Sequence, residues 1–322
     1  MITHKATNNH FLGADVSKDN ITFFCPQKEK VHTVSNTTKA LKPFLSKHKS
    51  QTVVLEATGG YEAKAIKVAV ELKMDIYRVN PFRVRAFMKA SGQFAKTDAL
   101  DAHALSDFAK HHHATLRKYV PPTDSQKELL QLNRRRDELL HMRTQENNRL
   151  KAPDNKNVAV GIEQHLMFLK KQIADVENRI NLLVEEDAEI RAKRDVLKQE
   201  KGVGDVIANS LLAAIPELGS VNRKQIASLG GLAPFAKDSG NYSGYRRTGK
   251  GRVNVRQLLF MAALSASRYN PKLKSFYGRL IDSGKKPMVA LTAVARKLLV
   301  ILNAKLRDAL IYPDDELNFK QG

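Results

Sequence analysis

Short apolar runs alternate with amphipathic segments over the first third of the chain. Two strands joined by a short polar turn are predicted within residues 10–26, and further strands over 31–35, 52–58 and 75–81. Apolar residues at helical spacing predict helices over 39–49, 61–73 and 98–112. Because strands and helices alternate, we expect an α/β domain with a largely parallel sheet.

Two long, charged segments without Gly or Pro interruption follow Pro121 and Pro122, and Thr123 is suited to cap the first of them. The segments cover 124–150 and 162–187. Apolar residues in the second are spaced by three and four, as in a heptad seam; they are Leu166, Leu169, Ile173, Val176, Ile180 and Leu183. This pattern predicts an antiparallel helical hairpin, with two ordinary packed helices or a coiled coil between chains as the alternatives.

From about residue 196 the composition shifts toward small residues and glycine. Apolar helices are predicted over 205–215, 223–230, 255–268 and 288–310, with an irregular loop over 234–252. We therefore expect three domains: an α/β domain over 1–120, a helical hairpin or coiled coil over 121–195, and a mainly α-helical domain over 196–322.

The net charge of the chain indicates the class of partner that it binds. The chain has 54 Lys and Arg residues against 33 Asp and Glu residues, a formal net charge of +21. Such an excess favours a polyanionic partner, DNA or RNA. A single cysteine, Cys25, excludes an intramolecular disulfide framework and a cysteine-based zinc site, and indicates a reducing cytoplasm. No apolar run reaches the roughly 18 uncharged residues that a membrane span needs, so no membrane partner is expected.

Four carboxylates occur where they could meet. Asp15 and Glu56 each end an apolar strand, while Asp98 and Asp101 are three residues apart and share one face of a helix. If the two strands are neighbours, the acids repel one another unless a divalent cation lies among them, and oxygen ligands favour Mg²⁺ or Mn²⁺. The order of these acids is that of a ribonuclease-H-like nuclease. Each acid also has an ordinary interpretation: a turn cap for Asp15, a lysine partner for Glu56 and a helix N-cap for Asp98.

A basic, glycine-rich loop supplies a second candidate site. It contains Ser239, a hydroxyl that nearby cations could help to activate as a nucleophile. Candidate nucleic-acid-binding residues surround it: Lys237, Tyr242, Arg246, Arg247, Lys250, Arg252 and Arg256. From composition alone, the Asp-Ser-Gly at 238–240 is better explained as a turn.

The motifs ADVSK, LEATGGYE, KTDALDA, GVGDVIA, QIASLGGLAP, DSG and RRTGKG follow one another in the order found in a known family. The chain resembles the insertion-sequence 110 family of transposases, the DEDD recombinases related to the Piv invertases, over about residues 10–310. The resemblance implies a RuvC-like (ribonuclease-H-like) N-terminal domain that binds metal through Asp15, Glu56, Asp98 and Asp101. It also implies a C-terminal transposase domain with Ser239 as catalytic serine. The family often has Glu before that serine, where this chain has Asp238, and Ser243 is a second nearby hydroxyl.

The function that the resemblance implies is DNA transposition in a bacterial cytoplasm, in association with the nucleoid. The carboxylate-bound metal would position the scissile phosphate, and Ser239 would attack it to form a covalent link to DNA. The implied partners are the DNA of the element ends and target, a structured guide RNA, and further copies of the chain in a dimer or tetramer. Two alternatives stay open: a metal-dependent Holliday-junction-type endonuclease that uses water, and a non-catalytic nucleic-acid-binding scaffold.

Overall fold

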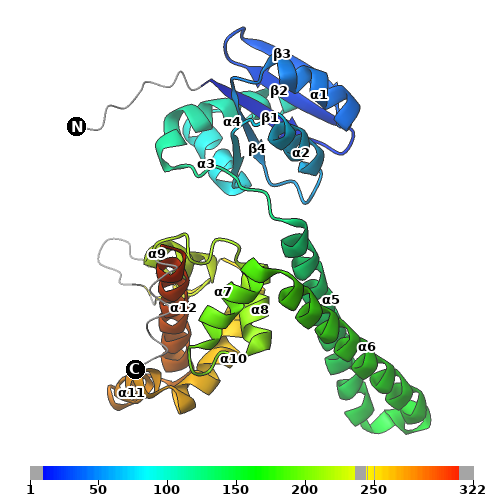
Figure 1. Cartoon of the computed structure of the whole chain (residues 1–322), viewed down its shortest axis with the longest axis vertical. Coiled ribbons are helices and arrows are strands. Elements are labelled where there is room, and N and C mark those ends of the chain that lie inside the picture. Colours follow the sequence, from blue (N-terminus) through cyan, green and yellow to red (C-terminus); the bar gives the residue numbers. More distant parts are fainter. Residues whose placement is uncertain (1–9, 236–243, 245, 250, 312–322) are drawn as a thin grey trace. The chain divides into compact units, whose positions relative to one another are not determined.

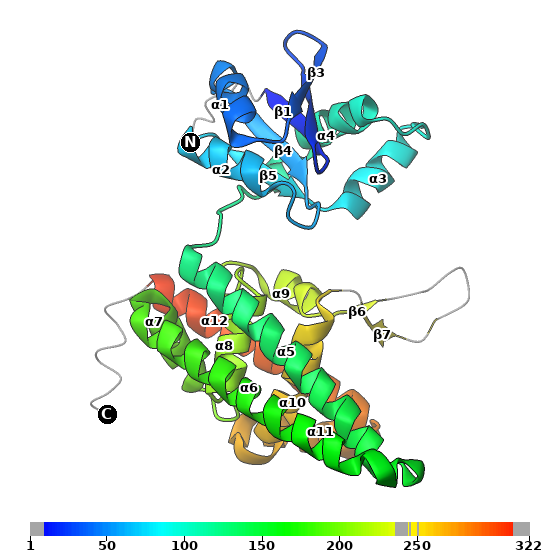
Figure 2. The same cartoon turned by 90° about the vertical axis from the view of Figure 1, so that its right-hand side faces the viewer.

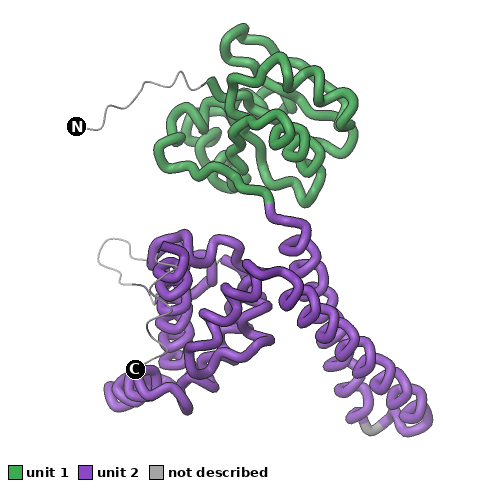
Figure 3. Tube along the Cα trace, in the orientation of Figure 1, with its two compact units in different colours: residues 1–121 green, residues 122–322 purple. Residues whose placement is uncertain are grey.

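The computed structural model describes residues 10–235, 244, 246–249 and 251–311. The chain forms two compact units, residues 1–121 and 122–322 (Figure 3). The helices predicted over 121–195 belong to the second unit, so the division into three domains stays a prediction.

A five-stranded sheet forms the centre of the first unit (Figure 1). Its strands are β1 (Phe11–Val16), β2 (Asn20–Cys25), β3 (Lys30–Ser35), β4 (Thr52–Glu56) and β5 (Ile76–Val79), in the order β3-β2-β1-β4-β5. β4 is parallel to both β1 and β5, whereas β2 is antiparallel to both β1 and β3. The expectation of a largely parallel sheet is wrong for β2 and β3, because the short turns around them allow only antiparallel pairing.

Helices cover both faces of this sheet. α1 (Thr38–Lys47) and α2 (Ala63–Glu71) share one apolar core with the sheet, and α3 (Pro81–Ala90) and α4 (Asp98–His112) share the other. The predicted helices are confirmed, but α3 was not expected, because Pro81 was interpreted only as the end of a strand. Proline also fits the first turn of a helix, and here the Asn80 side chain accepts a hydrogen bond from the Phe82 backbone N–H.

The second unit begins with two long helices that lie side by side (Figure 2). They are α5 (Asp124–Lys151) and α6 (Ala159–Glu186), joined by the 3₁₀ segment η2 (Pro153–Val158). Thr123 caps α5 as predicted, in a reciprocal capping box with Gln126. Leu169 and Ile173 of the predicted seam are buried against Leu139 of α5. The seam therefore joins two helices of one chain into a hairpin.

Replacing Ile173 by aspartate should destabilise this hairpin. The side chain is only 5% exposed, so the substitution places an unpaired charge in an apolar contact and should cost several kcal/mol, about 3 or more. Met167 on the same helix is 66% exposed, and Met167→Asp is the matched control. Urea unfolding of both variants measures the difference, and equal midpoints would contradict the packing of the seam.

The remaining helices pack into one apolar core. They are α7 (Ala188–Lys198), α8 (Asp205–Ala214), α9 (Arg223–Leu229), α10 (Val253–Tyr269), α11 (Pro271–Asp282) and α12 (Pro287–Ile311). Two short strands, β6 (Pro234–Phe235) and β7 (Arg247–Thr248), pair antiparallel beside them. The sequence interpretation ended the preceding helix at residue 187 and included neither α7 nor α11.

Among the described residues, α12 has the length and apolar content of a membrane-spanning helix. Its side chains at Val294, Leu298 and Leu302 are fully buried in the core of the second unit. Arg296 and Lys297 interrupt its apolar sequence near the middle. α12 is therefore explained as a core helix.

Candidate active site

Two of the predicted acids lie at neighbouring positions on adjacent parallel strands. The register pairs Ala14 of β1 with Leu55 of β4, so that Asp15 and Glu56 are each the next residue along. Both side chains are half-buried. The condition set by the sequence, that the two strands be neighbours, is met.

Close contact between β1 and α4 determines where the other two acids lie. Gly13 faces the α4 backbone so closely that a Cβ atom at this position would lie 1.9 Å from the Ala102 carbonyl oxygen. The Ser106 hydroxyl of α4 donates a hydrogen bond of 2.6 Å to the Phe11 carbonyl of β1. These contacts hold the α4 backbone directly against the strand that carries Asp15.

Asp98 and Asp101 both lie in the first turn of α4. The N-cap of this helix is Thr97, whose hydroxyl accepts a hydrogen bond from the Leu100 N–H. The alternative interpretation of Asp98 as the N-cap is therefore wrong, and its carboxylate is exposed beside that of Asp101 on the same helical face.

The four acids lie near enough to affect one another's ionisation. Burial, followed by the charges of Asp101 and Asp98, raises the pKa of Asp15 to about 6. Burial also raises the pKa of Glu56, and the charges of Asp15 and Asp101 add to that effect while Arg85 opposes it. The pKa of Asp101 is raised by burial and by Asp98, against the opposing charges of Lys96 and Arg85. Strand ends and helix thus form one acidic cluster of Asp15, Glu56, Asp98 and Asp101.

Sequence reasoning missed the two cations of this cluster. Arg85 is on α3, the helix that was not expected, and Lys96 lies two residues before Asp98. Only the proximity of Lys96 to the predicted acid pair could have indicated a role from the sequence.

The acidic cluster has the chemistry of a divalent-cation site without a preformed ligand shell. Among the described residues, no three His, Cys, Asp or Glu side chains are grouped closely enough to hold a metal ion as they stand. The donor set nevertheless could hold Mg²⁺ or Mn²⁺, because its ligands are carboxylate oxygens and a cation would offset the burial and the neighbouring negative charges that raise the pKa of Asp15.

A third residue that the sequence did not single out, Glu62, orders the loop that follows Glu56. Its buried carboxylate accepts hydrogen bonds from the Thr58 hydroxyl at 2.7 Å and the Gly60 N–H at 2.8 Å, and pairs with Arg78 at 2.6 Å. Burial opposes ionisation, but these hydrogen bonds and the Arg78 charge outweigh it and lower the pKa of Glu62. The loop also needs its glycines, because Gly59 and Gly60 have φ angles of 77° and 123°. Glu62 is therefore ionised and holds the loop, not a metal.

Gly13→Val should disrupt the acidic cluster by separating α4 from β1. The new side chain overlaps the Ala102 carbonyl, so α4 must move away from β1 at a cost of about 3 kcal/mol or more. We expect a lower Tm and loss of any stabilisation by Mg²⁺. Gly161→Val is the control, because a Cβ atom there meets no atom within 4 Å. A normal Mg²⁺-dependent shift in the Gly13 variant, measured by thermal unfolding, would contradict this account of how the acids are positioned.

The second candidate site is only partly described. Ser239, Lys237, Tyr242 and Lys250 lie outside the described residues, as does the alternative hydroxyl of Ser243. Of the other predicted nucleic-acid-binding residues, Arg246 and Arg247 are exposed at β7, and Arg256 is half-buried in the first turn of α10.

Arg252 differs from the other predicted nucleic-acid contacts. Its guanidinium donates hydrogen bonds of 2.8 and 2.7 Å to the two carboxylate oxygens of Glu217 and a third to the Ala214 carbonyl. These bonds fix the start of α10 to the end of α8. Its contact with nucleic acid stays a prediction, which would require this ion pair to be shared or broken.

Comparison with known proteins identifies the class of enzyme. Residues 12–153 match the DEDD transposase family model of IS110, and residues 194–278 match the transposase model of the IS116/IS110/IS902 family. Together the two models cover more than half of the chain. The chain is a transposase of insertion-sequence type and belongs to the IS110 family.

Individual relatives agree with this assignment. The pilin gene-inverting protein of Moraxella bovis is 28% identical over 261 residues, which cover 79% of this chain and 80% of that protein. The insertion element IS900 uncharacterized 42 kDa protein of Mycobacterium paratuberculosis is 29% identical over 162 residues, 48% of this chain and 39% of that protein. The relatives therefore include both insertion-element proteins and a DNA-inverting protein.

Proposed function

We propose that the chain cuts and rejoins DNA through the acidic cluster and the Ser239 hydroxyl. The observation that carries the proposal is that acids from β1, β4 and α4, which are distant in sequence, come together where β1 and β4 end. Burial, followed by the charges of Asp101 and Asp98, raises the pKa of Asp15, and burial, with Asp15 and Asp101, raises that of Glu56. A purely structural role would favour cationic partners, as Glu62 has in Arg78. We further propose that the first unit is RuvC-like, which is supported by its mixed sheet with acids at the ends of two adjacent strands.

Asp15, Glu56, Asp98 and Asp101 would hold Mg²⁺ or Mn²⁺. A bound divalent cation supplies charge that neutralises and orients a phosphodiester. Arg85 and Lys96 lie close enough to lower the pKa of Glu56, and they are placed to attract the phosphate backbone to the same cluster. In this proposal the four acids bind the metal ion, and Arg85 and Lys96 bind the phosphates of DNA.

In the proposed reaction the Ser239 oxygen forms a bond to the scissile phosphorus, and its proton passes to water. The bond from phosphorus to one deoxyribose oxygen breaks, and that oxygen takes up a proton from water, so the released strand ends in a hydroxyl. After strand exchange, a hydroxyl of the new strand attacks the phosphoserine and restores both the serine and the diester. The energy of the diester is retained throughout, so no nucleotide hydrolysis is needed.

Two further parts of the proposal concern partners and location. We propose that a structured guide RNA selects the DNA and that a dimer or tetramer carries out the reaction in the bacterial cytoplasm, at the nucleoid. The charge of +21 supports a nucleic-acid partner, and the relative named as a pilin gene-inverting protein supports DNA as the substrate.

The test is to trap the covalent intermediate. The full chain is mixed with labelled DNA carrying the element ends, with RNA transcribed from the flanking noncoding region, and with Mg²⁺. Denaturing electrophoresis should show a labelled protein–DNA adduct that disappears on protease treatment. Cleavage without an adduct would indicate the Holliday-junction-type endonuclease, and binding with neither would indicate the scaffold.

A further inference from the structure

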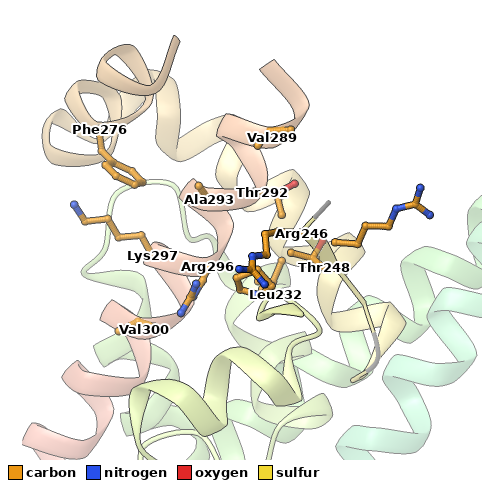
Figure 4. A pocket seen from close by; sticks show the side chains of 12 residues that line it. Leu232, Arg246, Thr248, Phe276, Val289, Thr292, Ala293, Arg296, Lys297 and Val300 are labelled. Carbon is orange, nitrogen blue, oxygen red and sulfur yellow. The ribbon is translucent and has the colours of Figure 1, made fainter. Parts of the chain in front are cut away.

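An open pocket of about 790 Å³ lies between the β6–β7 pair, α11 and α12 in the second unit (Figure 4). Its wall includes both strands that flank the loop of Ser239: Pro234 from β6 and Arg247 and Thr248 from β7. Phe235 and Arg247 are paired in register, and Ser239 is only four residues after Phe235 in the sequence. The pocket is thus adjacent to the base of the loop that carries the proposed nucleophile.

The surface of the pocket is apolar, with cations among its lining residues. Leu232, Phe276 and Val300 contribute apolar side chains, and Ala293 leaves space on α12 (Figure 4). The cationic lining residues are Arg246, Arg247, Arg296 and Lys297, and among the residues that the structure describes no acid lines the pocket. The Lys297 ammonium lies 4.3 Å from the centre of the Phe276 ring, which keeps a cation beside an aromatic surface.

The apolar surface and the cations together restrict which ligand the pocket can bind. An apolar segment of another protein would fill the space but would supply no anion for Arg247, Arg296 and Lys297. A duplex would contact the cations but could not enter a pocket of this size. An unpaired nucleotide satisfies both features, because its base is a flat, weakly polar ring system and its phosphate is an anion.

We propose that this pocket receives an unpaired nucleotide of the DNA strand that the neighbouring loop engages. The base occupies the apolar space beside Ala293 and Phe276, and the flanking phosphate lies against Arg296 and Arg247. By holding one nucleotide out of the duplex, the pocket fixes the register of the strand at the base of the loop between β6 and β7. The inference rests on the proposed function for the identity of its ligand, but not on any chemical step.

The pocket is tested with DNA that carries 2-aminopurine, a fluorescent adenine analogue that is quenched when stacked. The analogue is placed at an unpaired position near the element end and is titrated with full-length protein carrying Ser239→Ala, without divalent cation. Transfer of the base from the stacked strand into the pocket should raise the emission severalfold. Ala293→Phe, which fills the pocket, should abolish that rise while changing DNA affinity, measured by anisotropy, less than threefold.

Two comparisons make the result specific. Ala304→Phe on the same helix, half-buried but outside the pocket, should leave the rise unchanged. Arg296→Gln, which removes a cation without filling the pocket, should reduce the rise in emission. An undiminished rise in Ala293→Phe would overturn the proposal.

Another occupant would give a different outcome. Residues 312–322 contain three acids and one phenylalanine, so the chain's own C-terminal segment has a complementary composition. If the rise appears only after Asp314→Asn, Asp315→Asn and Glu316→Gln are combined, that segment is the occupant and the proposal is wrong.

Adduct formation by the protein with Ser239 intact is scored separately. An adduct without a fluorescence rise therefore rejects the pocket alone, and a rise without an adduct rejects only the serine chemistry.

Discussion

Ser239→Ala should abolish recombination and the covalent protein–DNA species while leaving DNA binding in place. The substitution removes the single oxygen that would attack phosphorus, and alanine has no group that can replace it. The substitution changes none of the cations of this region, among them the exposed Arg247, so affinity should change less than threefold. The measurements are denaturing electrophoresis for the adduct, a plasmid recombination assay and fluorescence anisotropy for binding.

Ser243→Ala is the matched control, because it removes a hydroxyl four residues away in the same basic loop. It should retain both the adduct and recombination. An adduct formed by Ser239→Ala but not by Ser243→Ala would assign the nucleophile to Ser243. Persistence of strand cleavage in both variants would identify water as the nucleophile and favour the endonuclease alternative.

The strands and most of the helices could be predicted because their signals are local. Short β-branched runs and a 3.6-residue periodicity can be recognised within a single element, because they reflect which of its faces is buried. α3 was missed because a proline after a strand can either end one element or begin the next, and only packing of Val84 against Phe108 decides. The antiparallel direction of β2 could also have been predicted, because the short turn between β1 and β2 permits only a hairpin.

The acids of the candidate site could be predicted because carboxylates at strand ends and at helical spacing stand out in a basic chain. Their cations could not, because Arg85 reaches the acidic cluster from a helix that the sequence interpretation lacked. Arg252 is the opposite case, a residue whose sequence context and structural contacts indicate different roles. Its place in a basic loop indicates nucleic acid, yet its guanidinium is bonded to Glu217, a residue 35 positions earlier.

Asp15→Asn should have opposite effects on stability with and without Mg²⁺. Burial and the neighbouring acids raise the pKa of Asp15 from 3.8 to about 6, so at neutral pH the folded state contains a carboxylate that it disfavours. Asparagine keeps the shape and removes the charge. Without divalent cation at pH 7.5, the variant should therefore be more stable than the unsubstituted protein by about 1–2 kcal/mol, less than a two-unit shift would give because the side chain is partly exposed.

The sign of the pH dependence follows from the same pKa. The folded protein binds the additional proton between pH 3.8 and about 6, so its stability relative to the variant is greatest at low pH and falls as pH rises through about 6. The advantage of Asp15→Asn should vanish near pH 4 and reach its full size above pH 7. Urea unfolding at pH 4, 5, 6 and 7.5 measures this difference.

Addition of Mg²⁺ should reverse the order at pH 7.5. A cation that binds only the folded state stabilises the unsubstituted protein by an amount that grows with the logarithm of its concentration, and the variant lacks one ligand needed to bind it. Asp15→Asn should therefore show little Mg²⁺-dependent rise in Tm and should lose DNA cleavage by at least a hundredfold. Glu71→Gln, which changes a carboxylate of α2 outside the acidic cluster, is the control and should respond to Mg²⁺ normally. Equal Mg²⁺-dependent shifts in the unsubstituted protein and Asp15→Asn would remove Asp15 from the metal site, even if the pH dependence held.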